Sequence, residues 1–169
     1  MKTVFLALAL IIGARSLPAQ ATFRNAVGLR LGYPISATFK HFLDDASAVE
    51  AFVGLRGYGF YNSFALGAAY QRHYSFEISD PDLAPLNWYW GAGASLRFWN
   101  YDRGDRRFLD DDYARTSLGL SGYLGLQYAF TGAPIELTLD WVPTVHVGNV
   151  FRGAFGADHG GLAVRYILR

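Results

Sequence analysis

The sequence predicts an all-β fold, an eight-stranded antiparallel up-and-down barrel, from three observations. The chain of 169 residues is long enough for one domain. Apolar residues alternate with small or polar ones over short segments, which is the pattern of strands. Turn-forming residues separate these segments. The absence of Cys excludes disulfides, thiolate metal sites, a cysteine nucleophile and a lipid-modified N-terminal cysteine.

The first 21 residues are predicted to be a cleavable signal peptide, which leaves residues 22–169 as the barrel domain. Lys2 supplies the positive start, and the apolar stretch Val4–Ala14 is too short to span a bilayer as a helix. Ala19–Ala21 fits the small-x-small cleavage rule. The alternative is a buried N-terminal helix. Removing the signal leaves a nearly neutral chain, so we expect no nucleic-acid partner.

Period-two alternation places the eight strands. Most are as long as the roughly 9–11 residues that a tilted strand needs to cross a membrane. The predicted segments are Arg24–Gly32, Ser36–Leu43, Ala48–Gly57, Tyr61–Phe76, Leu86–Tyr101, Arg115–Phe130, Ile135–Val147 and His159–Leu168.

The connections are of two kinds, as in outer-membrane barrels. Compact turns at Asp44–Ser47 and Thr131–Pro134 would lie at the periplasmic end, and long loops at Arg103–Ala114 and Gly148–Asp158 would lie outside. Glu77–Pro85 departs from this rule as a long inner turn. The outer connections near Pro34 and Tyr58 are unusually short.

The two faces of each strand differ in size and polarity. On Arg115–Phe130, one face is large and apolar, and the other carries Gly119, Ser121, Gly125 and Gln127. Because the interior of an eight-stranded barrel barely holds its side chains, the small and polar face is expected inside. The bulky face would then contact lipid. The alternative is a lipocalin-like soluble barrel with an apolar interior.

Aromatic residues gather near the segment ends, where their amphipathic rings suit the two membrane interfaces. Ordinary strand-end aromatics in a soluble sandwich are the alternative interpretation. The residues are Tyr74, Phe76, Trp88, Tyr89, Trp90, Phe98, Trp99, Tyr101, Tyr128 and Phe130.

Four stretches carry a family resemblance: Lys40–Leu43 leading into Ala48–Glu50, Leu86–Gly93, Ala133–Pro143 and Gly160–Tyr166. Together they resemble a group of small outer-membrane β-barrel proteins of Gram-negative bacteria. The resemblance implies residence in the outer membrane among its lipids and lipopolysaccharide, and handling by the barrel-assembly machinery. It implies no catalytic residues and no cofactor. The chain departs from many such barrels by ending in Arg169 rather than an aromatic residue, a role that we expect Tyr166 to take.

Charged residues on the polar face are predicted to pair inside the lumen, because an unpaired charge there is costly. Lys40 and Glu50 should lie opposite each other, and Asp140 and Arg165 fall on neighbouring strands. A plugged lumen predicts a structural or surface-interaction role. The alternative is a narrow, gated, porin-like channel. The residues are Arg30, Lys40, Glu50, Arg56, Arg97, Glu136, Asp140 and Arg165.

An enzyme is the distant alternative. His73, Ser75 and Glu77 share one strand face and are similar to the His-x-Ser of barrel-type lipid A deacylases. They lie on the lumen side at the periplasmic end, away from outer-leaflet lipid A. The four histidines lack metal-ligand spacing, so we expect no metal site, no cofactor and no small-molecule substrate.

One long loop carries the densest charge in the chain. A solvated loop is the default interpretation. The acidic run could gather calcium, and the arginines could meet lipopolysaccharide phosphates or another surface partner. The loop residues concerned are Arg103, Asp105, Arg106, Arg107, Asp110, Asp111 and Asp112.

Overall fold

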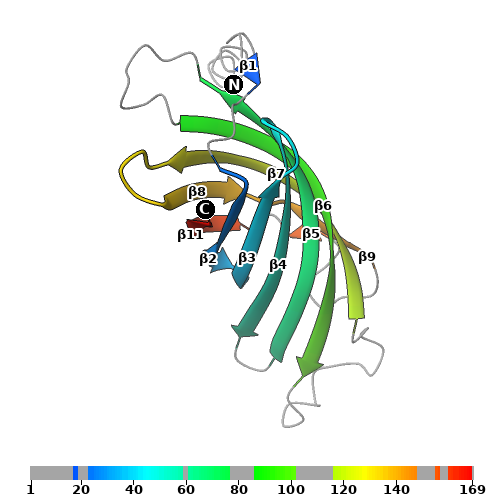
Figure 1. Ribbon diagram of the computed structural model, residues 1–169. Helices are drawn as coiled ribbons and strands as arrows, with labels where there is room; N and C mark the ends of the chain where they lie inside the picture. The colour runs from blue at the N-terminus through cyan, green and yellow to red at the C-terminus, as the bar shows by residue number, and fades with distance from the viewer. Residues whose placement is uncertain are drawn as a thin grey trace, which may run out of the picture.

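An antiparallel sheet of eleven strands in the described residues closes into a barrel in the computed structural model (Figure 1). The barrel wall has eight strand positions, because two of the strands are only two residues long and two others share one position. The structure describes residues 17–18, 23–58, 61–76, 86–101, 116–147, 155–156 and 160–168. The strands are β1 (Leu17–Pro18), β2 (Asn25–Tyr33), β3 (Ile35–Phe42), β4 (Ser47–Tyr58), β5 (Tyr61–Ser75), β6 (Leu86–Tyr101), β7 (Thr116–Ala129), β8 (Ile135–Trp141), β9 (Thr144–Val147), β10 (Phe155–Gly156) and β11 (Gly160–Leu168).

Each long strand pairs with its neighbour in sequence, and β11 closes the barrel. It pairs with β8 on one side and with β2 on the other, so that Ala163 faces both Thr138 and Arg30. The predicted antiparallel eight-stranded barrel is therefore confirmed. No helix in the described ranges is long and apolar enough to cross a bilayer.

The seventh predicted strand is divided into β8 and β9 by Pro143. Proline lacks the N–H that a sheet ladder needs. The N–H of Gly122 still donates to the carbonyl of Pro143 at 2.9 Å. Leu124 faces Trp141 and Ser121 faces Thr144, so β7 pairs with both pieces in one unbroken register. The two pieces therefore occupy one strand position in the barrel wall.

The predicted boundaries lie close to the observed ones. Leu86–Tyr101 agrees at both ends, and β7 is one residue shorter at each end than predicted. The short connection at Pro34 is confirmed, since β2 ends at Tyr33 and β3 begins at Ile35. The connection Gly148–Asp158 was predicted as a plain loop, whereas Phe155–Gly156 forms β10 against β9.

The structure leaves three predictions largely untested because they fall outside the described residues. These are the inner turn Glu77–Pro85, the charged loop Arg103–Ala114 and most of the signal segment. Within the signal segment, only Leu17–Pro18 is described, and it pairs with Ser75 and Tyr74 at the end of β5.

Large apolar side chains cover the outside of the barrel. Burial alternates along the strands, and on β7 the leucines point outward while Ser117, Gly119 and Gln127 point inward. Leu55, Leu139 and Trp141 each expose more than half of their surface. The lipocalin-like alternative, with an apolar interior and a polar exterior, is therefore wrong for the described residues.

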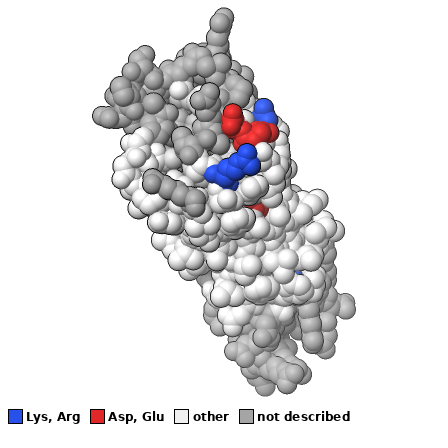
Figure 2. All heavy atoms as spheres, in the orientation of Figure 1, with Lys and Arg blue, Asp and Glu red and all other residues white. Residues whose placement is uncertain are grey.

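Exposed charges are confined to one end of the barrel, here called the turn end, which carries the β3–β4 turn at residues 43–46. Among the described residues, Arg24, Asp44 and Asp45 are exposed and Arg72 is half-buried, and every other charged side chain is buried. Figure 2 shows the same distribution on one face, with blue and red atoms gathered near one end above an almost uncharged wall. The opposite end, with the β2–β3 and β4–β5 connections, is the loop end.

Candidate functional site: the ion-pair network in the lumen

The charged residues of the strands lie in the lumen, because the alternation of side chains along each strand directs them inward. All eight residues predicted for the lumen are buried, with at most 7% of their surface exposed. Six of them form a connected network of ion pairs: Arg30, Lys40, Glu50, Glu136, Asp140 and Arg165. The other two, Arg56 and Arg97, lie nearer the loop end.

Glu136 on β8 is the first centre of the network. Its Oε1 accepts hydrogen bonds from Lys40 Nζ at 3.0 Å, from Arg165 Nη1 at 3.0 Å and from the Thr138 hydroxyl at 2.7 Å. Lys40 also donates to Gln127 Oε1 at 3.0 Å. Two cations therefore share one carboxylate oxygen in a site from which solvent is excluded.

Glu50 on β4 is the second centre. Its Oε2 lies 2.9 Å from Arg165 Nη2 and accepts from Gln71 Nε2 at 3.0 Å, while its Oε1 accepts from Arg30 Nη2 at 2.6 Å. Arg165 thus bridges both glutamates. Its side chain therefore links β11 to β8 and to β4.

Asp140 ends the chain of charges toward the loop end. Its Oδ2 accepts from Arg30 Nη2 at 2.8 Å and from the Tyr89 hydroxyl at 2.9 Å. The network therefore contains three bases and three acids in alternation and is balanced in charge. Such mutual pairing offsets the cost of removing charges from water.

Two predicted placements are confirmed, but the ion pairs of these residues join other partners. Lys40 does lie opposite Glu50 in the β3–β4 ladder, yet its ion pair is with Glu136, across the lumen. Arg165 is on the strand next to Asp140, but it faces Glu136, and Asp140 binds Arg30 instead. The Lys40–Glu136 and Arg30–Asp140 pairs depend on closure, because long side chains in a narrow tube reach strands that are not neighbours in the sheet. Arg165 and Glu136 are direct partners in the β8–β11 ladder.

Tyr89 was predicted for an interfacial aromatic belt, and that assignment is wrong. Its ring is fully buried in the lumen and its hydroxyl is part of the network. The signal was available in the sequence, because Tyr89 has the same strand parity as Ser95 and Arg97, which both point inward. Gln71, Gln127 and Thr138 also contact the network and were not predicted as site residues.

An apolar plug closes the lumen toward the turn end. It consists of Phe23, Ala26, Phe42, Ala48, Ala129 and Ile167. The rings of Phe23 and Phe42 pack edge to face with centroids 5.2 Å apart. Between this plug and the network lies His73, whose ring is 5.0 Å from that of Phe42 and 4.8 Å from that of Tyr89.

His73 and Ser75, two of the three candidates of the enzyme alternative, have different surroundings. His73 is fully buried, and neither ring nitrogen has a hydrogen-bond partner among the described residues. The Ser75 hydroxyl donates to Asn87 Oδ1 at 2.9 Å. Glu77 lies outside the described residues. A nucleophile needs a base within hydrogen-bonding reach, and His73 and Ser75 do not provide that geometry.

The remaining predicted residues are placed as follows. Arg97 Cζ lies over the ring of Trp99, 5.4 Å from its centroid, near the loop end. The loop residues Arg103, Asp105, Arg106, Arg107, Asp110, Asp111 and Asp112 lie outside the described residues. Within the described ranges, no three His, Asp or Glu side chains are grouped as metal ligands.

Comparison with family models, with curated proteins and with solved structures gives no match for this chain. The features that bear on function are therefore the barrel itself, its apolar exterior and the contents of its lumen.

Proposed function

We propose that this chain is an integral outer-membrane β-barrel protein with a closed polar lumen and a structural or surface-interaction role. One observation carries the proposal: apolar side chains cover the strand wall, while the described charges are either buried in the lumen or placed at the turn end. In water such a wall would be one continuous apolar surface, far larger than the patches that monomeric soluble proteins expose. In a bilayer it meets hydrocarbon.

The lumen supports closure rather than transport. Solute-sized channels need wider barrels, of about 16 strands. Here the ion pairs among Arg30, Glu50 and Arg165 fill the middle of the tube, and the Phe23–Phe42 plug fills the turn end. An ion moving along the axis would have to separate several buried pairs.

A narrow gated channel is the second candidate, favoured by one feature of the network. Glu50 and Glu136 each hold two cations, so an exchange of partners between Arg165, Lys40 and Arg30 would redistribute charge without leaving any group unpaired. An exchange of this kind would open the lumen briefly. The static network favours the closed state.

In this proposal residues 1–21 direct export and are removed, and the barrel-assembly machinery inserts the mature chain. The wall then contacts outer-membrane lipids, and the loop end faces lipopolysaccharide and the cell exterior. We propose no enzymatic activity, because the Ser75 hydroxyl donates to Asn87 and is not hydrogen-bonded to His73.

The proposal is tested by expressing the full chain in a Gram-negative host and fractionating its membranes. We expect the protein in the outer membrane, as a folded band whose gel migration changes on boiling. Planar-bilayer recordings of the purified protein should show at most small, infrequent openings. Recovery in a soluble fraction would contradict the membrane assignment, and large steady conductance would contradict the closed lumen.

A further inference from the structure

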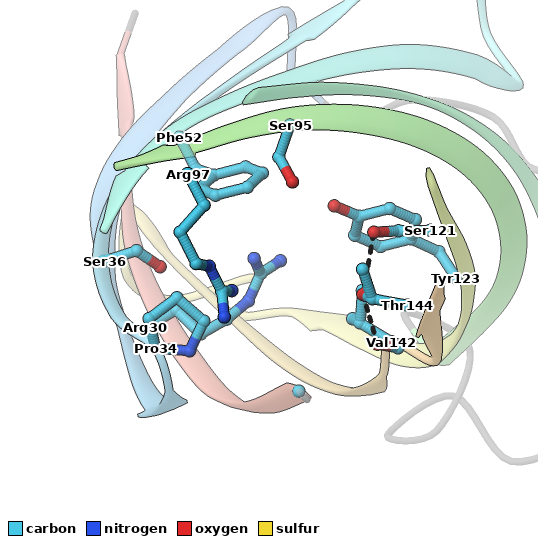
Figure 3. A pocket seen from close by; sticks show the side chains of 11 residues that line it. Arg30, Pro34, Ser36, Phe52, Ser95, Arg97, Ser121, Tyr123, Val142 and Thr144 are labelled. Atoms are coloured by element: carbon cyan, nitrogen blue, oxygen red, sulfur yellow. Dashed lines mark hydrogen bonds between the residues drawn. The ribbon is translucent and has the colours of Figure 1, made fainter. Parts of the chain in front are cut away.

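The cavity on the loop-end side of the ion-pair network is too small for a ligand other than water. Figure 3 shows this cavity, which Arg30, Ser95 and Tyr123 help to line, and its volume is about 20 Å³. One water molecule requires roughly 10–15 Å³. The outer face of the barrel is the larger surface on which a partner can bind.

Arg72 of β5 is the one cation on the outer face of the wall among the described strand residues. Aromatic side chains surround it near the turn end. Tyr70 and Tyr74 share its strand face, and Trp90 is its direct partner on β6. The rings of Tyr74 and Trp88 stack with centroids 4.8 Å apart. These five residues are here called the rim patch.

The hydroxyl of Ser47 holds Arg72 in place. Arg72 Nη1 donates to Ser47 Oγ at 2.7 Å, and the Tyr70 hydroxyl donates to the same oxygen at 3.0 Å. Ser47 itself is only 2% exposed. Because this partner is neutral, it leaves the charge of the guanidinium available. Asp44 in the adjacent turn acts on Arg72 through charge, but its Oδ1 is bonded to the N–H groups of Ala46 and Ser47. Arg72 therefore presents a positive charge with further N–H donors for an anion.

Short side chains follow the rim patch toward the loop end. Ala68 on β5 and Ala94 on β6 are direct partners, and Ala92 lies beside them on β6. All three are exposed. Beyond them stand Leu66 and Leu96, which are also direct partners and are 40% and 41% exposed. The alanines therefore leave room for a hydrocarbon chain against the wall, between the rim patch and the two leucines.

We propose that the rim patch binds one phospholipid, whose phosphodiester pairs with Arg72 and whose acyl chain lies over Ala68 and Ala94. The inference rests on the proposed function, in which the wall faces lipid and the turn end faces the periplasm. Guanidinium groups bind phosphate oxygens through paired N–H donors. Amphipathic aromatic rings suit the level of the headgroups. A phospholipid of the periplasmic leaflet matches both the charge at the rim and the apolar surface beside it, whereas free phosphate matches only the charge.

The test is native mass spectrometry of the full chain, expressed in a Gram-negative host and purified from its membranes in a maltoside detergent. The delipidated protein is titrated with phosphatidylglycerol, or with a digalactosyl lipid that has the same acyl chains and no phosphate. We expect the first phosphatidylglycerol to bind about fivefold more tightly than the digalactosyl lipid, the effect of one arginine near an anionic lipid. Free glycerol phosphate at the same concentration should not displace it, because it has no acyl chain.

Arg72→Gln should abolish the preference for the phosphate-bearing lipid. Arg24→Gln is the matched control, because it removes the same charge from the same end of the barrel. Arg24 is exposed and lies before β2, which is three strand positions from β5. We expect this control to change the preference by less than about twofold, because solvent and salt screen a charge at that separation. A gel band whose migration changes on boiling shows that each variant is folded.

Ala94→Leu tests the position of the acyl chain. The added bulk should weaken the binding of both lipids alike, because they have the same chains, and should leave the preference between them unchanged. Ala37→Leu is the control, since Ala37 is an exposed alanine on β3, away from the rim patch. We expect it to change neither affinity.

Equal affinities of the folded wild-type protein for the two lipids would overturn this inference and would leave the membrane assignment intact. Equal losses in Arg72→Gln and Arg24→Gln would also overturn it, since net charge alone would then explain the binding. Displacement by glycerol phosphate, or unchanged binding in Ala94→Leu, would overturn the placement of a lipid on this surface. Recovery of the chain in a soluble fraction is a separate outcome, which contradicts the proposed function itself.

Discussion

The ring of Tyr89 occupies the space in front of Gly125, its direct partner across the β6–β7 ladder. A methyl group built on Gly125 would lie 2.6 Å from Cζ of Tyr89. The glycine therefore provides the room for the Tyr89 ring, whose hydroxyl donates to Asp140. A glycine at position 125 of β7 therefore allows Tyr89 to join the ion-pair network.

Gly125→Ala should lower the free energy of unfolding by about 1–3 kcal/mol, because the added methyl overpacks the lumen against Tyr89. Gly132→Ala is the control, since nothing lies within 4 Å of a Cβ at that turn position. We expect the control to be neutral or slightly stabilising. Urea unfolding of the protein in lipid vesicles, followed by tryptophan fluorescence, measures both. Equal effects of the two substitutions would show that the Tyr89–Gly125 contact is unimportant.

Glu136→Gln should cost about 3–5 kcal/mol, because Lys40 and Arg165 would both lose a buried counter-charge. The double variant Lys40→Met with Glu136→Met removes one charge of each sign. We expect it to be less destabilised than Glu136→Gln alone. The same urea unfolding assay measures the three proteins. A double variant that is less stable than the single one would contradict the view that charge balance, rather than hydrogen bonding, dominates here.

The β3–β4 turn should depend on pH through Asp44. The pKa of this carboxyl lies below its ordinary value, mainly because the Ala46 N–H donates to Oδ1 at 2.8 Å, followed by the hydroxyl of Ser47. The Ser47 N–H also donates to Oδ1, at 2.7 Å. A depressed pKa means that the unfolded chain binds the proton more tightly than the folded turn does. The stabilisation is therefore present above the unfolded-state value of about 3.9 and is lost as pH falls through the folded-state pKa.

The measurement is amide hydrogen exchange at Ala46 and Ser47 as the pH is lowered, corrected for the intrinsic exchange rate. We expect protection to fall on acidification in the unmodified protein and to become independent of pH in Asp44→Asn. Asp45→Asn, which alters the neighbouring carboxylate, should retain the wild-type profile. A pH profile unchanged in Asp44→Asn would assign the effect to another group.

The strand pattern could be predicted from sequence because it is local. Period-two alternation identifies which residues face inward, as the burial of Arg30, Glu50 and Arg165 shows. Which acid binds which base could not be predicted in this way. The Lys40–Glu136 pair joins β3 to β8 across the lumen, and it depends on barrel closure and on the reach of two side chains. Tyr89 shows that strand parity, rather than membership of an aromatic cluster, decides which face of the wall a residue takes.

The central claim is that the apolar wall contacts lipid, and Leu139→Arg tests it most directly against Leu43→Arg. Leu139 on β8 is 58% exposed and Leu43 beside the β3–β4 turn is 54% exposed, so the two sites differ in position rather than in burial. The measurement is the free energy of unfolding of each variant in lipid vesicles. We predict a loss of about 2–4 kcal/mol for Leu139→Arg, because a charge would enter hydrocarbon. We predict a change within about 0.5 kcal/mol for Leu43→Arg at the rim. A change within that smaller range for both variants would mean that the wall around Leu139 faces water, which contradicts the account.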